Sequence, residues 1–212
     1  MMGPLVSTDW LAGSIGATDL VVLDATLFLP NEGKDGHAEF LRAHVPGARF
    51  LDLDLFSDQD THLPHMVPTA GRFGKLAGAL GVTENTRIVV YDQKGLFSAA
   101  RGRWLFRLFG HEAVAVLDGG LPAWRAGGHP VETGEPPPPA PATYVPDLRA
   151  DRLAGIGDVK RIIRQGSGEA TILDARAAGR FDGSAPEPRP GLPSGHMPGA
   201  VNLPFTAVLT TE

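Results

Sequence analysis

Two arginines in a segment rich in proline and glycine are placed where they could bind a small acid. Arg180 and Arg189 lie nine positions apart. A planar guanidinium donates two parallel hydrogen bonds to a carboxylate, a geometry that lysine cannot reproduce. The pair could therefore hold an organic acid. From these residues alone, the favoured alternative is two solvated loop charges with Glu187 or Asp182 as neighbours.

A carboxylate and a histidine form the second candidate pair. Asp54 and His65 lie eleven positions apart. A carboxylate that fixes the tautomer of an imidazole commonly prepares it for proton transfer. The alternative for His65, which stands between Pro64 and Met66, is a histidine packed between domains. The two interpretations remain equally open.

The 212-residue chain contains no cysteine. This excludes disulfides, thiolate-bound zinc, iron–sulfur clusters and a cysteine nucleophile within the chain. Its seven histidines show no metal-ligand spacing, and no GxxxxGK[ST] phosphate loop is present. We therefore expect neither a metal nor another cofactor.

The charge and the apolar runs of the sequence argue against two classes of partner, nucleic acids and membranes. The net charge of −5 argues against a nucleic-acid partner. No apolar run approaches the roughly 18 residues of a membrane span. No lysine or arginine precedes Lys34, so the start lacks the basic residues of a targeting segment. The expectations are no membrane partner and a cytoplasmic location.

Apolar segments alternate with helical patterns over the first 130 residues. Strands are predicted at 21–23, 88–91 and 114–117, and helices at 69–80, 98–109 and 121–126. This alternation predicts an α/β fold with a parallel sheet flanked by helices.

A proline-rich stretch divides the sequence. Residues 134–141 read GEPPPPAP, and consecutive prolines hold an extended shape that joins neither a helix nor a central strand. We predict a domain over 1–132, a semi-rigid linker over 133–147 and a second domain over 148–212. The alternative is a surface loop inside one domain.

Two motifs recur at nearly constant offsets. Leu23-Asp24-Ala25 returns as Leu173-Asp174-Ala175, 150 positions later, and the HVPGA motif at 44–48 returns as HMPGA at 196–200, 152 positions later. We infer two copies of one α/β domain. The second copy has only about half the length of the first, too short to complete its sheet. The second copy is thus expected to be truncated, with its apolar residues covered by atoms outside this sequence. The residues concerned are Ile172, Leu173, Val201 and Leu203.

The chain resembles the tandem-domain rhodanese family of sulfurtransferases, and within it the 3-mercaptopyruvate sulfurtransferases. The resemblance rests on the VLDA, LPHM, LFSA and LDGGL motifs at 22–25, 63–66, 96–99 and 117–121, and on 173–176, 180–191 and 195–200. In such proteins a cysteine of the second domain carries sulfane sulfur as a persulfide. The resemblance thus implies a rhodanese-like fold.

Asp92 occupies the corresponding position of the first copy, which implies a non-catalytic domain. A carboxylate cannot carry sulfane sulfur. Ala48 precedes Asp92 by 44 positions, and the same spacing after Ala200 places the second-copy cysteine near position 244, beyond this sequence. We therefore predict that this chain alone transfers no sulfur and that a C-terminal remainder completes the second domain.

The resemblance also assigns roles to the candidate residues. It implies that Arg180 and Arg189 bind the sulfur donor, and the second arginine favours mercaptopyruvate over thiosulfate. It implies that Asp54 and His65 join a serine outside this chain in a supporting relay. Recurring motif residues are interpreted as structural, namely His44, His196, Asp24 and Asp174.

The function implied for the parent protein is transfer of sulfane sulfur from 3-mercaptopyruvate to a thiol or cyanide acceptor. A thiosulfate sulfurtransferase is the alternative within the family. A non-catalytic rhodanese-like binding module is the alternative of another class.

Overall fold

A computed structural model of the chain describes residues 2–166, 170–189 and 191–210. The chain forms two compact units, which are considered separately. The first holds the residues up to Phe28 and Glu32–Arg152, and the second holds Leu29–Asn31 and the residues from Leu153 onward.

The first unit is built on a parallel sheet of five strands. Their order across the sheet is β1 (Leu5–Val6), β5 (Val114–Leu117), β4 (Arg87–Tyr91), β2 (Leu20–Asp24) and β3 (Arg49–Phe50). The three central strands confirm the sequence prediction. The two-residue edge strands were not predicted, because so short a segment carries no periodic pattern.

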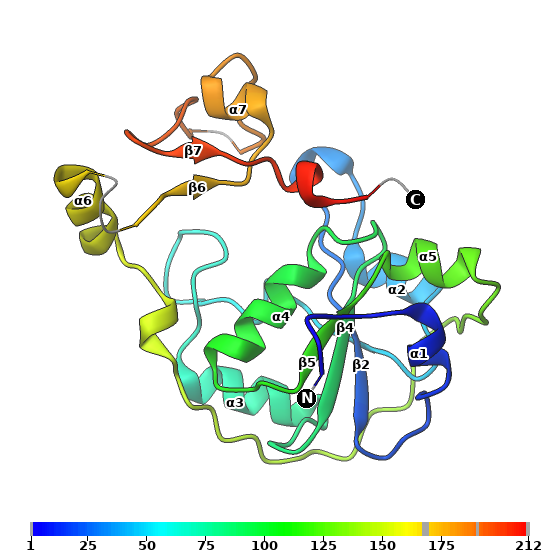
Figure 1. Cartoon of the computed structure of the whole chain (residues 1–212). Coiled ribbons are helices and arrows are strands. Elements are labelled where there is room, and N and C mark those ends of the chain that lie inside the picture. Colours follow the sequence, from blue (N-terminus) through cyan, green and yellow to red (C-terminus); the bar gives the residue numbers. More distant parts are fainter. Residues whose placement is uncertain (1, 167–169, 190, 211–212) are drawn as a thin grey trace. The chain divides into compact units, whose positions relative to one another are not determined.

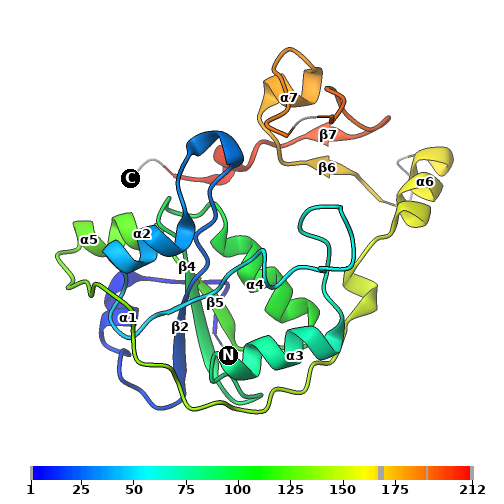
Figure 2. The same cartoon turned by 180° about the vertical axis from the view of Figure 1, so that it is seen from behind.

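Helices cover both faces of this sheet (Figures 1 and 2). One face carries α3 (Ala70–Ala79) and α4 (Ala99–Leu108), and the other carries α1 (Thr8–Ala12), α2 (Gly36–Arg42) and α5 (Gly120–Ala126). Short 3-10 turns span Pro30–Glu32 and Ala150–Arg152. The predicted α/β fold is confirmed.

Alternating strand residues separate the two cores. Leu23 and Val90 pack toward α3 and α4, whereas Val22 and Val89 pack toward the opposite helices. All four are at most 5% exposed. Burial on both faces explains why these strands are apolar throughout instead of alternating with polar residues.

Phe73 of α3 lies at the centre of an aromatic cluster in the first core. Its ring stacks on Phe109 at 4.2 Å between centroids. It meets Phe106 edge-on at 5.2 Å and Tyr144 at 5.8 Å. The cluster joins α3, α4 and a residue of the proline-rich segment in one core.

The predicted linker 133–147 lies within the first unit. Its Ala142 amide donates to the Gly78 carbonyl of α3 at 2.9 Å. The Tyr144 side chain is buried and its hydroxyl donates to the Phe109 carbonyl at 3.0 Å. The segment is therefore held against α3 and α4.

The second unit is small. It holds α6 (Ile156–Gln165), β6 (Leu173–Asp174), α7 (Ala178–Asp182), β7 (Val201–Asn202) and a 3-10 turn at Phe205–Val208. The two strands pair in parallel, with Leu173 opposite Val201. Leu173, Val201 and Leu203 are 59, 53 and 42% exposed. This sheet therefore presents apolar side chains to its surroundings.

Within residues 2–166, 170–189 and 191–210, no helix combines the length and the apolar character that crossing a bilayer requires.

Two glycines of α3 test how tightly the proline-rich segment is packed. A Cβ added at Gly78 would lie 2.2 Å from the Ala142 carbonyl oxygen, whereas a Cβ at Gly71 would meet nothing within 4 Å. Alanine normally favours a helix over glycine by about 0.5–1 kcal/mol. We expect Gly71→Ala to leave the free energy of unfolding unchanged or raised, and Gly78→Ala to lower it. Urea unfolding of both variants measures this, and equal stability would contradict the packing.

Candidate active site

The loop after β4 encloses the carboxylate of Asp92, which is fully buried. Oδ1 accepts the amides of Lys94 at 2.9 Å and Leu96 at 3.2 Å. Oδ2 accepts those of Phe97, Ser98 and Ala99 at 2.6–2.8 Å. Five N–H groups, including the first turn of α4, thus converge on one anionic group. This is the environment that would stabilise a thiolate if a cysteine stood there.

A buried polar network lies beside this loop. The Asp24 carboxylate accepts the amide and hydroxyl of Thr26 and the side-chain amide of Gln93. Burial raises the pKa of Asp24, and the hydrogen bonds from Thr26 oppose that rise. The Thr26 hydroxyl also accepts the amide of Gln93, the residue after Asp92, at 3.0 Å. The ends of β2 and β4 are therefore linked through polar side chains.

The predicted pair Asp54 and His65 comes together in the long loop between β3 and α3. His65 Nδ1 lies 3.3 Å from Asp54 Oδ1. The Asp54 side chain is 70% exposed, whereas that of His65 is 25% exposed. The arrangement can hold a proton on Nδ1 and leave Nε2 as the basic nitrogen.

Arg180 lies on α7 and contacts Glu187. Its Nε and Nη2 atoms donate to Glu187 Oε2 at 3.2 and 2.5 Å. Arg176 Nη1 donates to Oε1 of the same carboxylate at 2.7 Å, and Arg176 Nε donates to Asp174 Oδ1 at 2.9 Å. The Glu187 side chain is only 3% exposed. A series of charge-assisted hydrogen bonds therefore holds the loop after α7 in place. It connects Asp174, Arg176, Glu187 and Arg180 in that order.

The bonds to Glu187 use one edge of the Arg180 guanidinium. Arg180 donates to Glu187 from Nε and Nη2, whereas its Nη1 makes no bond to Glu187. Nη1 and the second N–H of Nη2 retain the fork geometry that suits a carboxylate. Sequence reasoning named Glu187 only as a neighbour and did not assign Arg176 to the site. No periodic pattern signals a carboxylate that folds back over an irregular loop.

Arg189 is partly buried and follows Glu187 by two positions. Arg180 and Arg189 belong to the second unit, whereas Asp54 and His65 belong to the first.

The histidines of the repeated motif make corresponding contacts in the two units. His44 Nδ1 lies 2.9 Å from the Phe40 carbonyl oxygen, and His196 Nδ1 lies 2.7 Å from that of Phe181. Each imidazole also stacks on the phenylalanine concerned, at 4.2 and 3.8 Å. Contacts of this kind orient the turn that follows, which supports the structural interpretation.

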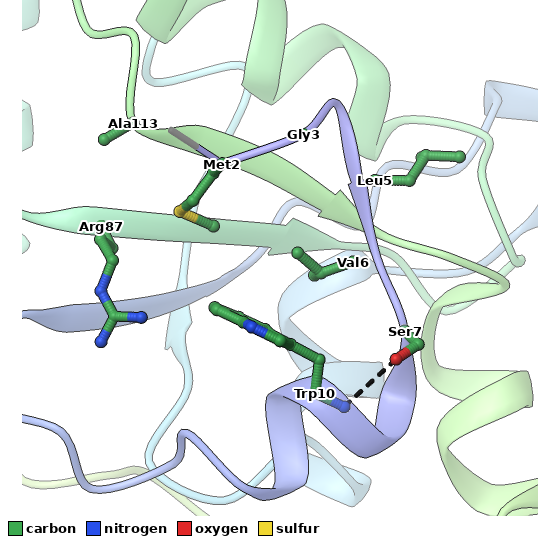
Figure 3. Close-up of a pocket in the computed structure, with 8 residues that line it drawn as sticks. All are labelled: Met2, Gly3, Leu5, Val6, Ser7, Trp10, Arg87 and Ala113. Atoms are coloured by element: carbon green, nitrogen blue, oxygen red, sulfur yellow. Dashed lines mark hydrogen bonds between the residues drawn. The ribbon is translucent and has the colours of Figure 1, made fainter.

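A cavity of about 650 Å³ lies beside β1 and contains none of the predicted site residues (Figure 3). Trp10 and Arg87 form part of its wall. Arg87 donates to both carboxylate oxygens of Asp19 at 2.7 Å. Its cation is thus already paired.

The Asp92 loop yields a prediction about thiol acidity. We expect Asp92→Cys, which introduces the only thiol of the chain, to have a thiol pKa below the usual value of about 8.5, because the five amides stabilise the thiolate. Thiolate absorbance against pH measures it without a reagent having to reach the buried sulfur. Asp118→Cys is the matched control, since Asp118 also follows a strand but is exposed. An equal or higher pKa at position 92 would refute the expectation.

The Asp174–Arg176 pair yields a prediction about pH. Hydrogen bonds from Arg176 lower the pKa of Asp174 to about 2, below its ordinary value of 3.8. At pH values above 3.8, the ionised carboxylate of Asp174 therefore stabilises the second unit. This stabilisation is lost as the pH falls from 3.8 through 2, because the carboxylate becomes protonated. Hydrogen bonds from Arg180 also lower the pKa of Glu187. We expect the amide signals of residues 174–189 to lose dispersion between pH 4 and pH 2. A profile unchanged by Asp174→Asn would contradict this.

Comparisons with known proteins agree with this architecture. A family model described as a rhodanese-like domain matches residues 7–127, more than half of the chain. The chain is 42% identical to human 3-mercaptopyruvate sulfurtransferase over 98% of this chain and 71% of that protein. It is 41% identical to thiosulfate/3-mercaptopyruvate sulfurtransferase 1, mitochondrial, of Arabidopsis thaliana over 95% of this chain.

A solved structure extends the similarity to three dimensions. SseA from Escherichia coli, described among 3-mercaptopyruvate sulfotransferases, matches with a TM-score of 0.85 and 33% identity over 99% of this chain and 78% of that one. The chain spans 58% of the length of the Arabidopsis relative. Together with the parallel sheet and the Asp92 loop, these similarities show that the chain belongs to the rhodanese family.

Proposed function

We propose that the chain is part of a sulfurtransferase that moves sulfane sulfur from 3-mercaptopyruvate to a thiol or cyanide acceptor. A cysteine thiolate outside residues 1–212 attacks the sulfur of the donor. The carbon–sulfur bond breaks, and the enolate of pyruvate leaves and takes up a proton. An acceptor thiolate or cyanide then removes the outer sulfur of the persulfide and regenerates the thiolate.

The contact between Asp54 and His65 carries this proposal among the described residues. Two residues predicted as a relay, eleven positions apart, meet at 3.3 Å. In the proposed reaction, Asp54 keeps the proton of His65 on Nδ1, and Nε2 exchanges a proton with the reacting groups. The names of the human and Arabidopsis relatives support the same reaction class.

The two arginines would bind the donor. Arg180 bonds Glu187 through Nε and Nη2 but not through Nη1, and the N–H groups of Nη1 and Nη2 that point away from Glu187 support a role in binding the donor carboxylate. Arg189 would bind the keto oxygen. Glu187 would keep Arg180 in place.

The cysteine would lie in a C-terminal continuation that also completes the second domain. The repeat spacing that points to position 244 supports this, as do the exposed apolar residues of β6 and β7. The corresponding contacts of His44 and His196 support a duplication. A cytoplasmic location is also a proposal, and fractionation of cells tests it, since the Arabidopsis relative is named as mitochondrial.

The isolated chain provides the first test. We expect the 212-residue polypeptide to release no pyruvate from 3-mercaptopyruvate in the presence of a thiol, because it contains no cysteine. A lactate dehydrogenase-coupled assay measures the pyruvate. Turnover by the isolated chain would refute the cysteine requirement. Inactivity of a longer product that carries the cysteine would favour the binding-module alternative.

Arg189 distinguishes the two donors. Thiosulfate remains the second candidate because the Arabidopsis relative is named for both donors. In the cysteine-bearing protein, we expect Arg189→Ala to reduce kcat/KM for 3-mercaptopyruvate at least tenfold more than for thiosulfate, since one charge-assisted hydrogen bond contributes about 1.5–3 kcal/mol. Equal losses on both donors would contradict the mercaptopyruvate preference.

A further inference from the structure

Two arginines hold the loop that carries Asp54 and His65. Arg72 of α3 donates from Nε and Nη2 to the carbonyl of Leu55 at 3.1 and 2.8 Å. Leu55 is the residue that follows Asp54 in the chain. Arg101 of α4 donates from Nη2 to the His65 carbonyl at 2.6 Å. The loop, cyan in Figures 1 and 2, runs beside α4 in both views. Each half of the candidate relay is thus tied to a helix through the backbone.

His65 has a left-handed backbone, with φ at +56°. This conformation is uncommon for a residue other than glycine and costs on the order of 1 kcal/mol or more. It persists only where surrounding contacts favour it. The bond from Arg101 is made to the carbonyl of this same residue, and it is short and charge-assisted.

The contact between His65 and Asp54 is too weak to impose this conformation. An exposed ion pair contributes about 0–1 kcal/mol, and the Asp54 side chain is 70% exposed. Arg101 is better held, because its guanidinium lies 4.4 Å from the Trp104 ring centroid on the same helix. Helix α4 is therefore the rigid partner in this contact, and the loop that carries His65 adopts the conformation that the contact with Arg101 requires.

We propose that Arg101 is a positioning residue, whose bond to the His65 carbonyl holds the imidazole against Asp54 and selects the Nδ1–H tautomer. The importance of this positioning for catalysis rests on the proposed function, since only that reaction requires Nε2 of His65 to be basic. The positioning itself is a property of the first unit. Arg101 acts through the backbone of His65 and has no assigned contact with the donor.

The tautomer of His65 can be measured on the 212-residue chain without sulfur transfer. Long-range ¹H–¹⁵N spectra, recorded at a pH of about 8.5 where a histidine of ordinary pKa is neutral, give the ratio of Nδ1–H to Nε2–H. His65→Gln assigns the signals among the seven histidines. We expect mainly Nδ1–H in the natural chain, whereas a free imidazole favours Nε2–H.

Three variants distinguish positioning from a general loss of structure. Arg101→Met keeps much of the aliphatic stem, and we expect it to shift the ratio to mainly Nε2–H. Arg101→Lys retains a single donor, and we expect an intermediate ratio. Arg103→Met is the matched control, because Arg103 lies on the same helix and donates to a different carbonyl, that of Val114, at 3.1 Å. We expect it to leave the ratio unchanged.

Three results would overturn the proposal. They are an unchanged ratio in Arg101→Met, an equal shift in Arg103→Met, or a natural chain without the Nδ1–H preference. If Arg101→Met does not fold, an unchanged ratio in Arg101→Lys overturns it. Because no turnover is measured, a longer protein that fails to transfer sulfur would refute the proposed function and leave this inference intact.

Discussion

The burial of one carboxylate organises the edge of the first unit's sheet at which β2 and β4 end. Asp92 is fully buried, and its two carboxyl oxygens accept hydrogen bonds from five backbone N–H groups. These N–H groups have no partner in a regular helix or strand, so the side chain satisfies them. The same bonds shape the loop between β4 and α4 and fix where α4 begins. Because α4 carries Arg101, the position of the candidate relay also depends on this loop.

In the second unit, too, a nearly buried carboxylate organises a loop, but its partners are charged side chains instead of backbone amides. Glu187 is nearly buried and accepts hydrogen bonds from Arg176 and Arg180, while Asp174 neutralises Arg176. A loop rich in proline and glycine has few backbone bonds of its own, so side-chain bonds determine its shape. The geometry of Arg180 thus depends on the nearly buried carboxylate of Glu187.

Arginine also acts on the backbone in the first unit. Arg72 and Arg101 each donate to a carbonyl of the loop between β3 and α3. That loop contains no periodic element, and His65 in it has an unfavourable backbone angle. Rigid helices thereby impose a conformation that local propensity opposes.

The sequence by itself determined the elements that depend on local pattern. The apolar runs that became β2, β4 and β5, and the amphipathic stretches that became α3 and α4, were predicted because burial of one or both faces leaves a periodic trace. Candidate residues followed from their chemical type and from a resemblance. The meeting of Asp54 with His65, the pairing of Arg180 with Glu187 and the role of Arg101 were decided by tertiary structure. Each joins irregular segments through directional bonds, and such bonds have no period that a linear sequence can display.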